Sequence, residues 1–221
     1  PTWLRRQRQM CIRDRFIDFG SWTLLGKTLE RTKASIFDAP VISTNKKYLK
    51  QIKQHLRKYK INNYKIVLEP AKRNTAPAIL STALIKDIPD NQPLMFFTAD
   101  HLIEKMSIFN KAINKNKKNL SDQNIFIFGI KPSSPSSEYG YFLTKKIKGN
   151  INKVTRFIEK PKEAKAKQII KNKGYWNSGM FYLRKDSIIN NFKKYQPKTY
   201  RNCLDAVSKA KYKANTYYLN K

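Results

Sequence analysis

The sequence has few cysteines and no long apolar run. Cys11 and Cys203 are the only cysteines in 221 residues, which excludes a disulfide framework and a zinc site built from cysteines. No apolar stretch approaches the about 20 residues that a membrane span needs, and Leu94–Phe97 is typical of the longest runs. Arg5–Arg15 is not followed by the apolar segment of a secretory signal. These absences predict a soluble protein of the cytoplasm.

Acidic residues are scarce, because 15 Asp and Glu stand against 46 Lys and Arg, a formal net charge of +31. A nucleic-acid-binding surface gathers basic residues in a stripe with aromatic side chains between them. Here the lysines are spread over the whole length and accompany abundant Asn and Ile, as the codons of an AT-rich genome produce. This pattern favours a solvated surface, whose charge would raise the local concentration of anionic substrates.

Residues 1–15 differ in composition from the rest of the chain. They contain five arginines and no lysine, whereas lysine dominates everything that follows. Such a break predicts a foreign segment, for example a cloning or sequence-assembly scar.

From residue 16 onward, strand and helix signals alternate. The periodicity predicts strands over residues 41–43, 65–68, 94–98, 125–130, 139–147, 154–159 and 180–183. It predicts helices over residues 46–58, 76–85, 107–117, 162–171, 186–194 and 202–210. Such alternation predicts an α/β fold with a mainly parallel, mixed sheet flanked by helices. Paired strand signals after residue 139 indicate added antiparallel strands.

Polar residues follow two of the predicted strands, where open α/β sheets bind ligands. The loop over residues 69–78 offers backbone N–H groups and Asn and Thr side chains, which suit a planar base or an anion. Asn74 or Thr75 is equally suited to cap the helix that follows. Asp100 can hold Mg²⁺ against phosphate oxygens or cap the next turn. His101 is typical of a hydrogen-bonded structural histidine.

Three later segments carry polar residues beside strands. Gly140, at a strand start between two tyrosines, marks a bulge or the close approach of another backbone or a ligand. Glu159 and Lys160 end a strand on opposite faces, so both reach one ligand only if the chain turns before Pro161. Asn177 begins a small polar trio. Each of these features, taken singly, also has a purely structural explanation.

Taken in order, these segments form a set of motifs. They read LEPAKRNTAPAI (68–79), TADH (98–101), FGIKPSSPSSEYGYF (128–142), FIEKP (157–161) and YWNSGMFYL (175–183). This series closely resembles the bacterial mannose-1-phosphate guanylyltransferases, whose motifs LEPxxRNTAPAI, PADHxI, FGIxPxxPxxxYGYI, FxEKP and WNSGMF occur in the same order at similar spacing. The segment over residues 16–32 is similar to the one that leads into the family's first helix. The resemblance covers residues 16 to 219.

The resemblance implies a sugar-nucleotidyltransferase fold, Rossmann-like and similar to the GT-A fold, with a partial nucleotidyltransferase domain over residues 16–221. It implies that GTP and α-D-mannose 1-phosphate give GDP-mannose and pyrophosphate, with Mg²⁺ as cofactor. The protein would supply positioning and charge neutralisation rather than a covalent nucleophile. The matched positions assign guanine contact to Arg73, Asn74, Thr75 and Ala76, metal coordination to Asp100, the sugar pocket to Gly140, Glu159 and Asn177, and neutralisation of the sugar phosphate to Lys160.

The sequence also departs from the family pattern. The family's GGxGTRLxPLS loop, which holds the nucleotide phosphates, and the PK pair after it have no match, and residues 1–15 stand in their place. The SIDYAVME segment, the WxDxGSW element with the second metal ligand, and the isomerase domain of two-domain members are also missing. The resemblance therefore implies an incomplete domain, and we expect this chain alone to be inactive.

Three alternatives stay open. Guanine preference rests on RNTAPA alone, so another sugar-1-phosphate nucleotidyltransferase could use dTTP or UTP with glucose 1-phosphate. A basic nucleic-acid-binding module is disfavoured because no helix-turn-helix, zinc or RRM signature is found. A non-catalytic homologue that binds sugar nucleotides is the third. The expected partners are GTP and mannose 1-phosphate, without nucleic acid or membrane, and the oligomeric state is open, including a homo-oligomer of the full-length protein.

Overall fold

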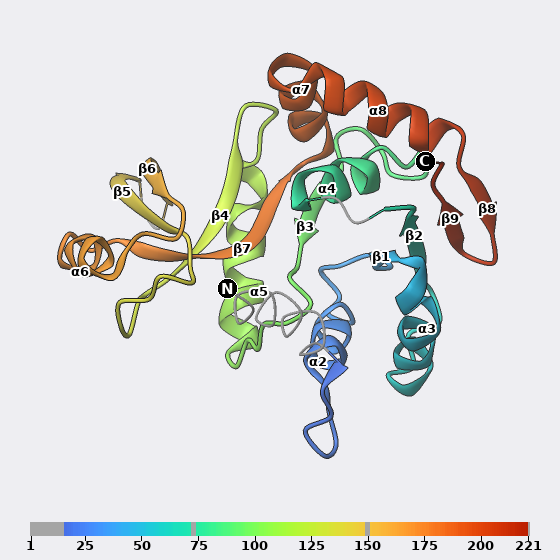
Figure 1. Cartoon of the computed structure of the whole chain (residues 1–221), viewed down its shortest axis with the longest axis horizontal. Coiled ribbons are helices and arrows are strands. Elements are labelled where there is room, and N and C mark those ends of the chain that lie inside the picture. Colours follow the sequence, from blue (N-terminus) through green and yellow to red (C-terminus); the bar gives the residue numbers. More distant parts are fainter. Residues whose placement is uncertain (1–15, 72–73, 149–150, 221) are drawn as a thin grey trace, which may run out of the picture. The chain divides into compact units, whose positions relative to one another are not determined.

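The computed structural model describes residues 16–71, 74–148 and 151–220 (Figure 1). The chain divides into two compact units: of the described residues, 16–125 and 183–220 form unit 1, and the rest, within 126–182, form unit 2. Within the described ranges, no helix is long and apolar enough to cross a bilayer. The segment predicted to be foreign, residues 1–15, lies outside the described residues.

Unit 1 contains most of the helices and a four-stranded sheet. The sheet order is β1-β2-β9-β8, in which β1 runs parallel to β2, β2 parallel to β9, and β8 antiparallel to β9. The helices and strands of this unit are α2 (Leu24–Arg31), β1 (Val41–Asn45), α3 (Leu49–Lys58), β2 (Lys65–Glu69), α4 (Thr75–Ala83), β3 (Pro93–Phe96), α5 (Met106–Asn116), α7 (Lys185–Tyr195), α8 (Pro197–Ser208), β8 (Lys211–Lys213) and β9 (Thr216–Tyr218).

The core of unit 1 lies between one face of the sheet and two helices. Successive strand residues point to opposite faces, so Ile66 and Leu68 of β2 share a face. They pack with the apolar faces of α2 and α3, which contribute Leu25, Leu29, Ile52 and Leu56. Helix α4 also packs against β1 and β2. None of its buried residues belongs to that core cluster, which places α4 on the other face.

Unit 2 is built around antiparallel strands. Strand β5 (Tyr141–Lys148) pairs with β6 (Ile151–Ile158) and, through its first two residues, with β7 (Tyr175–Arg184). Strand β4 (Ile125–Ile130) pairs with β7. Helix α6 (Glu163–Lys171) supplies two of the residues in a small buried cluster, which consists of Tyr141, Ala166 and Ile169. Strand β7 then leads back into unit 1 at residue 183.

The predicted α/β class is confirmed, and so are the antiparallel strands expected after residue 139. Three element predictions need correction. Strand β7 begins at Tyr175 rather than residue 180, and α8 begins at Pro197 rather than residue 202. The hairpin of β8 and β9 was not predicted. Its turn consists of Ala214 and Asn215, which have positive φ of 48° and 59°.

Two helices end in a left-handed lysine. Lys60 follows α3 with φ 53°, and Lys173 follows α6 with φ 57°. Each occupies the position just past a helix where glycine is most common, because a left-handed conformation crowds the Cβ of other residues.

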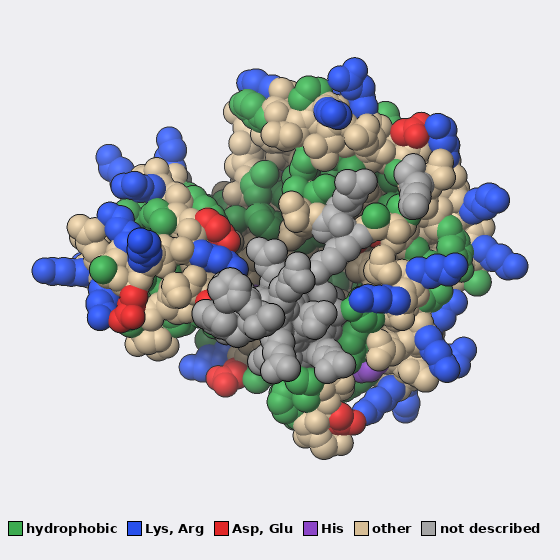
Figure 2. All heavy atoms as spheres, in the orientation of Figure 1, with side chains coloured by type: hydrophobic (Ala, Val, Ile, Leu, Met, Phe, Trp, Pro, Cys, Tyr) green, Lys and Arg blue, Asp and Glu red, His purple; other side chains and the backbone are tan. Residues whose placement is uncertain are grey.

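The basic side chains are distributed over both units. On the face shown in Figure 2, Lys and Arg lie over much of the described surface, singly and in small groups, with Asp and Glu among them. This spread agrees with the solvated-surface interpretation of the charge and shows no basic stripe on the visible described surface.

Candidate functional site

The predicted guanine-contacting residues lie at the start of α4. Asn74 occupies the N-cap position with extended backbone (φ −72°, ψ 171°), yet its side chain makes no capping hydrogen bond. Thr75 and Ala76 are the first helical residues, and all three side chains are exposed. Arg73 lies outside the described residues. The side chain of Asn74 is therefore available to a ligand, and the free backbone N–H groups of the first turn can face an anion.

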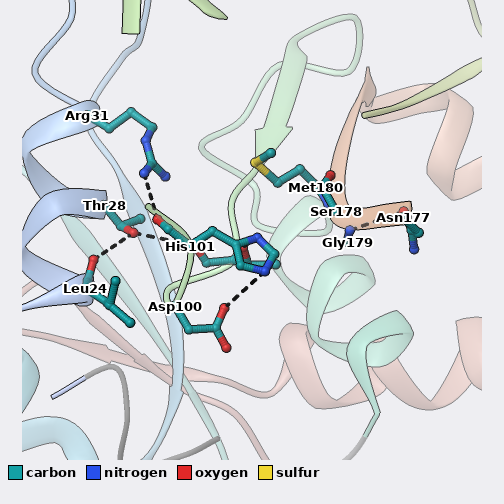
Figure 3. Close-up of polar contacts among 10 residues, drawn as sticks. Leu24, Thr28, Arg31, Asp100, His101, Asn177, Ser178, Gly179 and Met180 are labelled. Carbon is teal, nitrogen blue, oxygen red and sulfur yellow. Dashed lines mark hydrogen bonds and ion pairs between the residues drawn. The ribbon is translucent and has the colours of Figure 1, made fainter. Parts of the chain in front are cut away.

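Asp100 lies in the turn after β3, and helix α2 holds both ends of this turn (Figure 3). Arg31 donates from Nη2 to the carbonyl oxygen of His101 over 2.9 Å. The hydroxyl of Thr28 shares its one proton between the carbonyl oxygen of Leu24, 3.1 Å away in α2, and that of Thr98, 3.5 Å away. Thr98 Oγ1 and His101 Nδ1 share a hydrogen bond of 2.6 Å across the turn. The backbone on both sides of Asp100 is thus fixed.

Arg31 is almost fully buried, with 4% of its surface exposed. Its guanidinium carbon lies 5.2 Å from the centre of the Phe97 ring, within range of a cation–π contact. Nε and Nη1 find no hydrogen-bond partner among the described residues, and burial lowers the pKa of the guanidinium. Burying a charge is costly, and the one side-chain hydrogen bond that Arg31 makes to the described residues holds the Asp100 turn.

The Asp100 carboxylate is accessible and lightly engaged. Its side chain is 36% exposed, and His101 Nε2 lies 4.0 Å from its Oδ1. The described residues contain no cluster of three or more His, Cys, Asp or Glu that could enclose a metal. Mg²⁺ needs no such enclosure, since it is usually bound by one or two carboxylates with water and substrate phosphates. The donor set at Asp100 fits that mode.

Unit 2 brings together the three residues predicted to line the sugar pocket. A Cβ on Gly140 would lie 2.8 Å from Glu159 Oε2, closer than side chains tolerate, so only glycine leaves this carboxylate its place. The backbone N–H of Asn177 donates to the Gly140 carbonyl oxygen over 2.8 Å. The sequence predicted a bulge or the close approach of another backbone or a ligand at Gly140, and the close neighbour in the structure is instead the side chain of Glu159.

The chain turns at Lys160, as joint action with Glu159 requires. Lys160 has a positive φ of 41°, which breaks the strand alternation directly after Glu159. Both side chains are exposed. On the other side of the trio, Asn177 Oδ1 accepts from the N–H of Gly179, and Ser178 Oγ accepts from the N–H of Met180, each over 3.2 Å (Figure 3). These bonds fix the backbone of the Asn-Ser-Gly segment within β7.

Two polar partnerships were not predicted. The first is the clamp of Thr28 and Arg31 on the Asp100 turn, whose partners lie 70 residues apart. The second joins the carboxyl ends of β1 and β2, where Ser43 Oγ donates to Glu69 Oε1 over 2.6 Å. Both join distant segments, and the only local signal was the position of Glu69 at the start of the polar loop.

Comparison with known proteins gives one family. The model of the family described as "Nucleotidyl transferase" matches residues 12–219. The alginate biosynthesis protein AlgA of Pseudomonas fluorescens is 30% identical over 206 residues, which cover 91% of this chain and 43% of that protein. A mannose-1-phosphate guanylyltransferase, RfbM, of Salmonella typhimurium is 33% identical over 193 residues, covering 85% of this chain and 40% of its own.

A solved structure supports the same fold. The crystal structure of a mannose-6-phosphate isomerase from Helicobacter pylori superposes with a TM-score of 0.81 at 27% identity. The match covers 94% of this chain and 81% of that one. The chain spans about two fifths of the length of the curated relatives, as the 43% and 40% coverages state.

Proposed function

Because the chain belongs to the nucleotidyl transferase family, we propose that the whole protein transfers GMP from GTP to α-D-mannose 1-phosphate. The products are GDP-mannose and pyrophosphate. The observation that carries the choice of sugar phosphate is the grouping of Gly140, Glu159 and Asn177 in unit 2, because the resemblance assigns these positions to the sugar. The name of the Salmonella relative supports the same choice. The proposal concerns the whole protein, since this chain spans only part of its relatives.

The chemistry asks the protein to bring two anions together. An oxygen of the sugar phosphate attacks the α-phosphorus of GTP in line, a P–O bond forms, and the bond to the β-phosphate oxygen breaks with departure of pyrophosphate. Lys160 would neutralise the sugar phosphate, and Glu159 would accept hydrogen bonds from mannose hydroxyls. Asn74, Thr75 and the first N–H groups of α4 would hold the nucleotide. Positioning and charge neutralisation of this kind are the main sources of rate in phosphoryl transfer.

Asp100 would hold Mg²⁺ with the help of water and phosphate oxygens. When bound, the ion would offset the negative charge of the nucleotide phosphates. The chain's own contribution is to keep the carboxylate accessible and its backbone fixed, which Arg31 and Thr28 do from α2. We also place the protein in the cytoplasm, where its nucleotide and sugar phosphate substrates occur.

The test is a nucleotide panel with the purified whole protein. GTP with mannose 1-phosphate should give GDP-mannose, and Asp100→Asn should lower kcat/KM by about 10³-fold because charge compensation at the phosphates is lost. The exposed Asp122→Asn serves as a matched control and should leave the rate unchanged. A protein that accepts only UTP or dTTP with glucose 1-phosphate would refute the proposal.

A further inference from the structure

Two polar side chains from different helices of unit 1 lack partners and line the same pocket. The pocket has a volume of about 420 Å³ and is lined by residues of α2, of α5 and of the segment between β3 and α5. Arg31 of α2 and Asn110 of α5 are among them. The volume lies within the range of small-molecule sites. The proposed function gives none of these residues a contact with the nucleotide, the sugar phosphate or Mg²⁺.

Arg31 brings an unpaired cation to the pocket. Its guanidinium makes one hydrogen bond to the described residues, from Nη2 to the His101 carbonyl oxygen (Figure 3), and Nε and Nη1 find no partner. No described carboxylate pairs with this guanidinium. Glu30, which also lines the pocket, pairs with Lys27 at 2.9 Å. Because a buried charge without a counter-ion is costly, the pocket favours an anion that supplies the missing acceptors.

The pocket also presents acceptors that lack donors. Asn110 Oδ1 is buried and has no hydrogen-bond partner. Glu104 lines the pocket with an exposed side chain and forms no ion pair with any described residue. An unpaired buried acceptor is unfavourable, so the same ligand is favoured if it also carries hydrogen-bond donors, above all cationic ones.

Three apolar side chains complete the chemistry of the wall. Leu102, Ile103 and Met106 line the pocket, and Leu102 is 51% exposed. A ligand with an apolar body that covers these side chains would remove apolar surface from water. The pocket therefore matches a molecule with an anionic group, a cationic donor and an apolar part.

We propose that this pocket binds a free α-amino acid with an aliphatic side chain. The carboxylate would give the Arg31 guanidinium the acceptors that it lacks, and the ammonium group would donate to Asn110 Oδ1 and to Glu104. The aliphatic chain would pack on the three apolar side chains. A phosphate would bring further negative charge beside Glu104, and a simple amine would leave Arg31 unpaired. The proposal is independent of the proposed function.

The experiment uses leucine and two analogues that each lack one of its charged groups. Isocaproate keeps the carboxylate and the branched chain without the ammonium group, and isoamylamine keeps the ammonium group without the carboxylate. Isothermal titration of the whole protein should give leucine a Kd of about 1 mM or below, which a ligand of this size can supply. Each analogue should bind at least about tenfold more weakly, the loss expected for a missing hydrogen-bonded charge. If isocaproate or inorganic phosphate binds as tightly as leucine, the pocket selects an anion alone and the proposal is wrong.

Two variants test whether leucine binds in this pocket. Asn110→Ala removes the buried acceptor and Glu104→Gln removes the unpaired carboxylate, and each should raise the Kd for leucine about tenfold. The matched controls are Asn114→Ala, at an exposed position one turn further along α5, and Glu163→Gln, at an exposed residue of α6. Both controls should keep the wild-type Kd. A wild-type Kd in either Asn110→Ala or Glu104→Gln overturns the proposal.

Arg31→Gln tests the cation itself and should raise the Kd for leucine at least about tenfold. Thermal unfolding reports whether this variant is folded, and a folded Arg31→Gln variant with the wild-type Kd overturns the proposal. Where Arg31→Gln does not fold, the two other variants and the two analogues decide. The absence of leucine binding to the wild-type protein also overturns the proposal. Titration needs no turnover, so a protein that forms no GDP-mannose would contradict the proposed function and leave this result unchanged.

Discussion

The two units hold their candidate site residues in different ways. In unit 1 the residues follow β2 and β3, and a partner far away in the sequence, Arg31, fixes the turn of Asp100. A second buried cation, Lys185, fixes the segment before β3. Its Nζ donates to the Ile88 carbonyl oxygen over 2.5 Å and pairs with Asp90 Oδ1 at 3.0 Å. In unit 2 the residues lie within or directly beside the neighbouring strands β5, β6 and β7, and a backbone hydrogen bond joins Asn177 to Gly140.

This difference predicts that the site residues of the two units respond to different kinds of substitution. The unit 1 residues depend on a core of eight buried side chains from α2, α3, β2 and the turns after α3. The unit 2 residues depend on a cluster of three buried side chains and on glycine at one position. Substitutions in the unit 1 core should therefore weaken the binding of the nucleotide. Local backbone changes in unit 2 should weaken the binding of the sugar phosphate.

The largest effect should come from truncating the core of unit 1. Leu56 is 1% exposed in that core, so Leu56→Ala should lower the free energy of unfolding by about 3 kcal/mol through lost burial and a cavity. The matched change in unit 2 is Ile169→Ala, at a residue 2% exposed. It should open mainly residues 141–182, because its cluster is small. Urea unfolding and hydrogen exchange resolved by peptide measure both. If Ile169→Ala lowers the protection from hydrogen exchange equally in both units, the chain unfolds as one cooperative unit and the proposed difference between the units is wrong.

A smaller effect, confined to the sugar side, should follow Gly140→Ala. The added Cβ would meet Glu159 Oε2 at 2.8 Å and displace the carboxylate. We expect the KM for mannose 1-phosphate in the whole protein to rise about tenfold, the loss of one charge-assisted hydrogen bond, with the KM for GTP unchanged. Steady-state kinetics with each substrate varied in turn provide the measurement.

The double variant Gly140→Ala with Glu159→Gln tests the cause. If the alanine acts through Glu159, the two effects will not add, because both remove the same contact. Full additivity, or a change in the KM for GTP alone, would show that Gly140 acts in another way.

The smallest effect concerns pH and the edge of the unit 1 sheet. The Asp87 carboxylate accepts hydrogen bonds from Lys65 Nζ at 2.5 Å and from the Tyr217 hydroxyl at 2.6 Å. The bond from Lys65, followed by that from Tyr217, lowers the pKa of Asp87. A lowered pKa in the folded state means stability that is present above the unfolded pKa, about 3.9, and is lost as pH falls further.

Asp87→Asn should therefore flatten the fall in stability below about pH 4, by less than about 1 kcal/mol because the side chain is 44% exposed and screened by solvent. Thermal unfolding from pH 6 to pH 2 compares the two proteins. At the alkaline end, burial and the bond to Asp87 raise the pKa of Tyr217, so that contact should persist above the pH at which free tyrosine ionises. Parallel acid curves for wild type and Asp87→Asn would contradict the assignment.

The sequence predicted the alternation of strands and helices because that information is local. Periodicity marks α3 and β2, and Pro77 marks the first turn of α4. Strand β7 was predicted too short because its Asn-Ser-Gly segment is small and polar, and its pairing with β5 is a property of the fold. The hairpin of β8 and β9 escaped prediction because Ala214 stands where such turns usually have Asn or Gly.

The candidate site divides in the same way. The motifs predicted Gly140, Glu159 and Asn177, and the structure groups these three within unit 2. The supporting residues could not be predicted, since Ser43 and Glu69 meet only through the register of β1 and β2. The role of every one of these site residues remains a prediction, including those of Gly140, Glu159 and Asn177 and those of Asn74, Thr75, Ala76, Asp100 and Lys160. Arg73 falls outside the described residues.

The left-handed lysines at residues 60 and 173 carry a thermodynamic consequence. A side chain in this conformation costs on the order of 1 kcal/mol that glycine avoids. The chain thus gives up stability at two helix ends in a sequence with 46 basic residues and 7 glycines. Lys60→Gly and Lys173→Gly would relieve this conformational strain, so the two helix ends are simple sites at which stability could be regained.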